Sequence, residues 1–158
     1  MNNIENDIGM FMRVALEEAK LAALYDEVPV GAVLVRNNEI IARDHNRTIE
    51  NNDPTSHAEL NVIRKGAQRL NNYRLNDCDI YTTVEPCMMC AGALINARVR
   101  SVYFGCYDEK GGAAGSRVNL FEKGLFNHNV NVYQGLLKQE SAMLLKNFFQ
   151  SKRNLKTV

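Results

Sequence analysis

Hydrophobic positions along the 158-residue chain follow two spacings, one typical of helices and one typical of strands. Residues 5–24 carry apolar side chains three and four apart with charged side chains between them, which predicts an amphipathic helix. Residues 30–35 and 39–43 are short apolar runs separated by Asn37-Asn38, and asparagine tolerates the positive φ of a two-residue turn. The chain is therefore expected to begin with a helix followed by a β-hairpin.

The rest of the chain alternates strand-like and helix-like patterns. After a polar loop over 44–54, Thr55 is placed to cap a helix from Ser56 to about Leu70. The later elements are expected as a strand at 79–84, a helix that follows Pro86 and runs to about Ala97, strands at 101–104 and 130–133, and a final helix at 136–149. Because strand–helix–strand units pair their strands in parallel, the prediction is a three-layer α/β/α fold with a central mixed five-stranded sheet and helices on both faces.

Composition places limits on the class of protein. Apolar residues make up 46% and charged residues 23%, an ordinary mixture for one globular domain of this length. No apolar run approaches the ~20 residues that span a bilayer, and the first residues lack the basic start and apolar stretch of a signal peptide. We therefore expect a cytoplasmic protein without membrane contact, whose four cysteines are thiols or metal ligands rather than disulfides.

Charge is distributed unevenly although the net charge is only +1. Residues 1–27 hold six acids and two bases, whereas residues 138–158 hold five bases against Glu140 alone. The five bases are Lys138, Lys146, Lys152, Arg153 and Lys156. A basic tail is typical of a protein that binds a polyanion. The alternative is a solvated helix end whose cations complement the helix dipole.

Two short motifs carry the candidate chemistry. Cys87 and Cys90 follow Pro86 three residues apart, so at a helix start their side chains share one face, within about 6 Å. The positive end of a helix favours thiolates, the form that binds metal. His57 is the natural third ligand because a neutral imidazole suits zinc. Three protein ligands leave a fourth tetrahedral position for water, which is typical of a catalytic zinc site.

A C-x-x-C pair alone has other meanings. It can be half of a structural zinc site, but that site needs a fourth ligand, and Cys78 and Cys106 are isolated cysteines that form no second pair. It can also be a redox pair, which would leave the segment 57–59 unexplained. Catalytic zinc is therefore the interpretation that accounts for both motifs.

Glu59 is the candidate proton carrier. It lies two residues after His57, and such positions in a regular helix point apart, so both reach one centre only at the first turn. A lone helical glutamate is usually exposed, but this chemistry needs a carboxylate. Zinc lowers the pKa of bound water to about 7, and an adjacent glutamate can pass the water's proton to a ring nitrogen and then to the leaving amine. The pattern H-x-E…P-C-x-x-C is the signature of zinc nucleobase deaminases.

The sequence resembles the bacterial tRNA-specific adenosine deaminases, a family within the cytidine deaminase-like superfamily. The resemblance runs over nearly the whole chain. It is carried by EVPVGAV at 27–33, DPTSHAE at 53–59, NYRL at 72–75, EPCMMCAGA at 85–93 and GGAAGS at 111–116. The zinc signature alone indicates the superfamily, whereas the first strand, the glycine-rich loop and the length favour the tRNA branch.

The resemblance implies a single zinc-dependent deaminase domain over residues 1–158, with a cytidine deaminase-like fold. It implies hydrolysis of adenosine to inosine at the wobble position (34) of the tRNA-Arg(ACG) anticodon. It further implies one Zn²⁺ per subunit, no organic cofactor, and a homodimer that holds the anticodon stem-loop. The family roles make His57, Cys87 and Cys90 the zinc ligands and Glu59 the proton shuttle.

The resemblance also assigns substrate contacts. Asn46 matches an asparagine that hydrogen-bonds to the flipped base, and the Ala58 backbone amide lies where the purine is held. Asp108 matches a residue near a ribose hydroxyl, a contact through which a site prefers RNA to DNA. Immediately before Asp108 the family pattern leads us to expect a small and a basic residue, but this chain has Cys106 and Tyr107.

Two alternatives remain open from the sequence. A free-base or nucleoside deaminase of the guanine or cytidine type would share the zinc site. A zinc module that binds RNA without catalysis would share the basic tail. That tail favours a polyanionic substrate over a small molecule.

Overall fold

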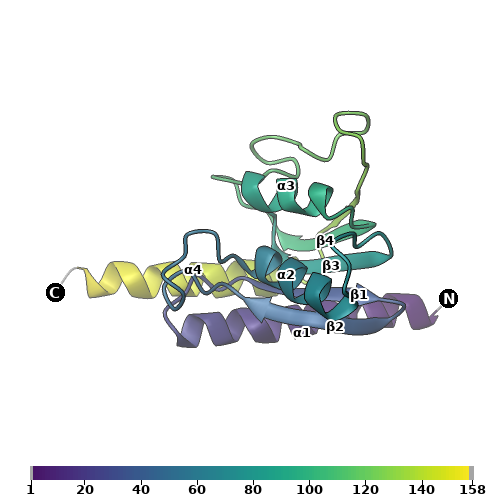
Figure 1. Cartoon of the computed structure of the whole chain (residues 1–158). Coiled ribbons are helices and arrows are strands. Elements are labelled where there is room, and N and C mark those ends of the chain that lie inside the picture. Colours follow the sequence, from purple (N-terminus) through teal and green to yellow (C-terminus); the bar gives the residue numbers. More distant parts are fainter. Residues whose placement is uncertain (1, 157–158) are drawn as a thin grey trace.

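The computed structural model describes residues 2–156 and contains one mixed sheet between two layers of helices (Figure 1). The elements are α1 (Asn2–Leu24), β1 (Gly31–Arg36), β2 (Glu39–His45), α2 (Ala58–Leu70), β3 (Cys78–Val84), α3 (Met88–Asn96), β4 (Ser101–Cys106), β5 (Asn131–Gln134) and α4 (Lys138–Leu155). The five strands have the order β2-β1-β3-β4-β5. β1 pairs antiparallel with β2 and β3, whereas β3, β4 and β5 are parallel. The predicted mixed five-stranded sheet is confirmed.

The helices cover both faces of the sheet. α2 and α3 pack on one face, and α1 and α4 pack on the other (Figure 1). Successive β1 residues point to opposite faces, so Leu34 joins the cluster under α2 and α3 while Val33 joins the cluster under α1. Because β1 is central and buried on both faces, its sequence is a continuous apolar run rather than an alternating one. The three-layer prediction is confirmed.

The predicted start of α2 was wrong by two residues. The helix begins at Ala58, and His57 is its N-cap residue with extended backbone (φ −78°, ψ 153°). Thr55 does not cap it, because the Thr55 amide and hydroxyl both donate to the Asp53 carboxylate, at 2.8 and 2.7 Å. Asp53 thus holds the chain in a local turn before the helix, and His57 is left outside the regular helix.

Other boundaries also differ from the expected ones. β2 continues to His45, so the polar loop beside the sheet begins at Asn46 rather than Asp44. α4 starts at Lys138, after Gly135 and Leu137 adopt positive φ values of 88° and 49°. It then continues to Leu155, beyond the last apolar pair, because its polar C-terminal residues remain good helix formers.

The fold brings two helix starts to one place. α2 and α3 begin close together near the carboxyl end of β3, since His57 and Cys87, their N-cap residues, are in contact. Ligands of open α/β sheets bind outside the carboxyl ends of strands. Among residues 2–156, no helix is long and apolar enough to cross a membrane.

Candidate active site

The three predicted metal ligands converge. His57 Nδ1 lies 3.7 Å from Cys87 Sγ and 3.5 Å from Cys90 Sγ, and the donor atoms of all three residues lie within 4.8 Å of one another. Zinc bonds of about 2.3 Å to sulfur and 2.0–2.1 Å to nitrogen place tetrahedral ligand atoms about 3.6 Å apart. The donor types and their spacing therefore fit a zinc ion with three protein ligands.

The three predicted ligands shift one another's pKa values. A hydrogen bond from Cys90 is the main cause that lowers the pKa of Cys87 to about 4; His57 adds to it, and burial acts in the opposite direction. The same pairing, together with burial, raises the pKa of Cys90. The hydrogen bond to Cys87 raises the pKa of His57. Without metal, these contacts therefore favour the thiolate form of Cys87 and the protonated forms of Cys90 and His57.

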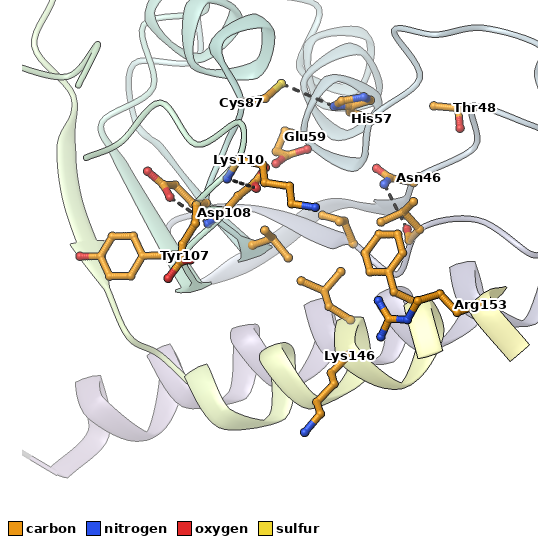
Figure 2. Close-up of a pocket in the computed structure, with 17 residues that line it drawn as sticks. Asn46, Thr48, His57, Glu59, Cys87, Tyr107, Asp108, Lys110, Lys146 and Arg153 are labelled. Carbon is orange, nitrogen blue, oxygen red and sulfur yellow. Dashed lines mark hydrogen bonds between the residues drawn. The ribbon is translucent and has the colours of Figure 1, made fainter. Parts of the chain in front are cut away.

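Glu59 completes the group. Its side chain is only 3% exposed, with Oε2 3.5 Å from Cys90 Sγ and Oε1 accepting a 3.2 Å hydrogen bond from the Thr82 hydroxyl. Burial raises the pKa of the Glu59 carboxyl. Because His57 precedes the regular helix, the two side chains reach one centre although they are two residues apart. Figure 2 shows Glu59 beside His57 and Cys87 at one side of a cleft.

This group opens into a main cleft of about 730 Å³. The cleft is lined by Val28, Val30, Asn46, Thr48, His57, Glu59, Val84, Glu85, Cys87, Tyr107, Asp108, Glu109, Lys110, Leu145, Lys146, Phe149 and Arg153. Apolar walls with a few convergent polar groups are typical of a ligand site, and the volume is in the usual range for one.

Of the predicted substrate contacts, Asn46 and Asp108 line the main cleft and Ala58 does not. Asn46 Oδ1 accepts the Ala58 backbone amide at 2.9 Å, and its Nδ2 donates to the Val28 carbonyl at 3.1 Å. Asp108 Oδ1 accepts the backbone amide of Lys110 at 3.1 Å, so this residue also forms a turn. Ala58 is fully buried, and its amide serves to hold the Asn46 carboxamide in place.

Two buried glutamates, to which the sequence had assigned no role, fix the loops around the cleft. Glu85 accepts the backbone amides of Asp108, Ala114 and Ser116 at 2.9–3.0 Å, and it also accepts the Ser116 hydroxyl. Glu27 accepts the Thr48 hydroxyl and the backbone amides of residues 49 and 50 at 2.7–2.9 Å. The only sequence signal was that both belong to segments carrying the family resemblance.

The basic residues of the C-terminal segment differ in where their side chains lie relative to the cleft. Arg153 lines the main cleft and turns its guanidinium toward it, whereas the Lys146 side chain is directed away (Figure 2). Lys152 forms an ion pair with Asp26 at the end of the N-terminal segment. The cleft gains a further cation that the tail does not supply, because the Lys110 side chain extends across it (Figure 2).

The chain matches known deaminases over most of its length. The family model of the MafB19-like deaminases matches residues 6–153. A tRNA-specific adenosine deaminase of Agrobacterium fabrum is 50% identical over 143 residues, which cover 90% of this chain and 94% of that protein. The chain belongs to the tRNA-specific adenosine deaminase family.

Other relatives agree with this family. The tRNA-specific adenosine deaminase of Bacillus subtilis is 44% identical to this deaminase, over 93% of this chain and 91% of that one. A structure from a study of A-to-I editing by tRNA:A34 deaminases superposes with a TM-score of 0.84 at 49% identity, covering 86% and 99% of the two chains. A guanine deaminase of Bacillus subtilis is more distant, with 33% identity, 92% coverage of each chain and a TM-score of 0.61.

Proposed function

We propose that this deaminase hydrolyses adenosine to inosine at the wobble position (34) of the tRNA-Arg(ACG) anticodon. The proposal is supported most directly by the group formed by His57, Cys87, Cys90 and buried Glu59, which opens into the main cleft. The chain that carries this group is 50% identical to a tRNA-specific adenosine deaminase. Adenosine and water are consumed, and inosine and ammonia are released, so no redox cofactor or organic cofactor is required.

We propose that His57 Nδ1, Cys87 Sγ and Cys90 Sγ hold one zinc ion per subunit, since their spacing fits that metal. When bound, zinc would lower the pKa of a coordinated water to about 7. The remaining steps depend on Glu59. Its Oε2 lies beside Cys90 and takes one proton of the attacking water, while the Thr82 hydroxyl keeps Oε1 in position. The carboxyl passes this proton to the purine ring nitrogen. It then takes the proton that remains on the added oxygen and delivers it to the departing amine as the bond between carbon and that amine breaks.

The burial of Glu59 favours both the uptake and the release of the proton. A raised pKa brings the Glu59 carboxyl closer to the pKa of the water and of the base, which favours proton transfer near neutral pH. Glu59 is also shielded from bulk solvent, because the residue is almost completely buried. The proton therefore passes to the substrate rather than to bulk solvent.

The base and the ribose are proposed to bind on opposite sides of this group. Asn46 has one amide hydrogen and one carbonyl lone pair engaged by Val28 and Ala58, which leaves it a second hydrogen and a second lone pair for the base. The Asp108 carboxylate can accept a hydrogen bond from the ribose 2′-hydroxyl. Lys110 and Arg153 supply positive charge for phosphates, and Phe149 offers an apolar wall.

The homodimer and the cytoplasmic location are also proposed here, on the basis of the family resemblance. In such an assembly each subunit would carry its own group of His57, Cys87 and Cys90. The anticodon stem-loop would be the macromolecular partner.

The test is the product formed from different substrates. The purified chain with zinc is given an anticodon stem-loop carrying adenosine at position 34, and, separately, guanine and cytidine. We expect inosine in the RNA and no ammonia from the small molecules. Ammonia from guanine or cytidine without inosine in the RNA would contradict the proposal and favour the free-base or nucleoside alternative.

A further inference from the structure

A relay of hydrogen bonds joins the loop before α2 to the end of β2. The Asn51 side-chain amide donates to the Ser56 hydroxyl at 2.9 Å, and that hydroxyl donates to Asn61 Oδ1 at 3.1 Å. Asn61 Nδ2 donates in turn to the His45 backbone carbonyl at 3.0 Å. The reaction proposed above gives no role to this relay of Asn51, Ser56 and Asn61.

All hydrogen bonds of the relay run in one direction. The single hydrogen of the Ser56 hydroxyl goes to Asn61, so the same hydroxyl accepts from Asn51 through a lone pair. The Asn61 carboxamide has only one orientation in which it accepts from Ser56 and donates to a carbonyl at the same time. Ser56 and Asn61 are only 1% and 7% exposed, and aligned hydrogen bonds in such an interior strengthen one another. The relay therefore fixes the Asn61 side chain.

Asn61 connects the chain segments that carry two functional residues. Its oxygen accepts from Ser56, which precedes the proposed metal ligand His57, and its nitrogen donates to His45, which precedes Asn46. Ser56, Asn61 and His45 do not line the main cleft, whereas His57 and Asn46 do. Asn61 can therefore affect the reaction only through the residues that it holds in place.

Asn46 is attached to α2 at two levels. The Ala58 amide, in the first turn of α2, donates to Asn46 Oδ1 at 2.9 Å. Asn61 lies about one turn further along the same helix, and its bond to the His45 carbonyl holds the peptide group that joins His45 to Asn46. One helix thus holds both the side chain of Asn46 and the backbone that carries it.

We propose that Asn61 is a positioning residue for base binding, which holds the peptide group between His45 and Asn46 against α2 and so keeps the Asn46 carboxamide in its place in the main cleft. This rests on the proposed function, because it requires that Asn46 binds the reactive base. Asn61 itself lies outside the main cleft. Its contribution to RNA binding should therefore depend on the presence of both the reactive base and Asn46.

The first measurement compares the Kd of two anticodon stem-loops, one with adenosine and one with an abasic residue at position 34, on a Glu59→Gln background where the RNA is not consumed. Asn61→Asp retains an oxygen for the Ser56 hydroxyl but cannot donate to the His45 carbonyl, and Asn61→Leu removes both bonds without adding a charge. We expect each variant to weaken binding of the adenosine stem-loop about 2- to 10-fold, the factor for one hydrogen bond. The Kd of the abasic stem-loop should stay unchanged. Equal losses for both stem-loops, or no loss for either, would overturn the proposal.

Val62→Ala is the matched control. Val62 is the next residue of α2 and is fully buried in the core cluster, so this variant loosens the packing of the helix without touching the relay. Urea unfolding should show a loss of stability for Val62→Ala, and the Kd of both stem-loops should stay at the parent value. Selective weakening of the adenosine stem-loop by Val62→Ala would mean that any loosening of α2 has this effect, which would contradict a specific role of Asn61.

The second measurement asks through which residue Asn61 acts. Asn61→Asp is combined with Asn46→Ala, and we expect it to weaken binding of the adenosine stem-loop no further once the Asn46 carboxamide is gone. Losses that add in the double variant would exclude Asn46 as the mediator. Zinc content should equal that of the parent in both Asn61 variants, and loss of zinc would show instead that Asn61 acts through His57. If neither Asn61 variant folds, Ser56→Ala interrupts the relay with a smaller change and should also weaken binding of the adenosine stem-loop alone.

The two proposals fail in distinguishable ways. The chain with intact Glu59 is first tested for inosine formation on the adenosine stem-loop. If no inosine forms, the proposed function is wrong. If inosine forms normally but the Asn61 variants weaken both stem-loops equally, only the positioning role of Asn61 is wrong.

Discussion

The positions of individual side chains at the active site depend on the conformation of the backbone that carries them. His57 is a cap residue and Glu59 a helical one, and this change of conformation lets side chains two residues apart meet. Asn46 is held by two backbone groups, which fix the orientation of its carboxamide. The structure brings together residues that the sequence had named, but the contacts that orient them come from elsewhere in the chain.

Glu59→Gln tests proton transfer while preserving side-chain shape. We expect kcat to fall by about 10²- to 10⁴-fold, because an amide cannot take up and return the proton. Single-turnover inosine formation on the stem-loop measures the loss. Zinc content and RNA affinity should stay at the level of the parent, and a variant that keeps full turnover would exclude Glu59 as the proton carrier.

Zinc affinity should increase with pH. Cys90 and His57 have raised pKa values and must release their protons on binding, whereas Cys87, with a pKa of about 4, has already lost its own. Each released proton strengthens binding by up to about tenfold per pH unit. Titration against a chelator at about pH 6 and about pH 8, corrected for the chelator's own protonation, measures this. Affinity that is constant or falls with pH would contradict the assignment of the ligands.

At the scale of elements, hydrophobic periodicity was sufficient to place the helices and strands. It failed at the starts of α2 and α4, where Asp53 and a pair of positive-φ residues decide the boundary. It also could not show that Phe149 on α4 lines the same cleft as Tyr107, because that depends on how α4 docks on the sheet. Glu85 was overlooked as an anchor for the same reason, since its partners lie more than twenty residues away.

Two glycine substitutions should have opposite effects on stability. A Cβ at Gly112 would overlap the Glu85 carboxylate and lie 2.6 Å from the Asp108 carbonyl, so Gly112→Ala should lower the free energy of unfolding by about 1–3 kcal/mol. Gly92 lies inside α3 with nothing within 4 Å, so Gly92→Ala should raise it by about 0.5–1 kcal/mol. Urea unfolding of both variants measures the difference. Equal effects would mean that Glu85 yields to the added methyl group.

At the scale of the whole molecule, the predicted basic tail proves to be only one contributor to the charge around the cleft. Lys152 connects α4 to the N-terminal segment through its ion pair with Asp26. The cations that line the cleft come from two separate segments, with Lys110 on a loop and Lys146 and Arg153 on α4. Sequence counting found the excess of positive charge. It could not tell which cation is used inside the fold and which faces a ligand.

Lys110→Gln and Lys152→Gln distinguish a cation that contacts the RNA from a cation that forms an ion pair within the fold. Lys110→Gln removes one phosphate contact. It should therefore weaken stem-loop binding and reduce the slope of log Kd against log salt by about 0.7, the value per contact for single strands. Lys152 is paired with Asp26, so its substitution should leave the slope unchanged. Kd values at a series of salt concentrations provide the test. Equal slopes for both variants would exclude Lys110 as a phosphate contact.

The two buried glutamates have a consequence for how this site can vary between proteins. Glu27 and Glu85 hold their loops mainly through backbone amides, which every residue except proline provides. Side chains on these loops, such as Glu109 and Lys110, can therefore be exchanged without removing the bonds that shape the loops. A new substrate preference can arise by substitution at such positions while the catalytic group keeps its geometry. In this arrangement, the recognition of RNA and the chemistry of deamination can evolve separately.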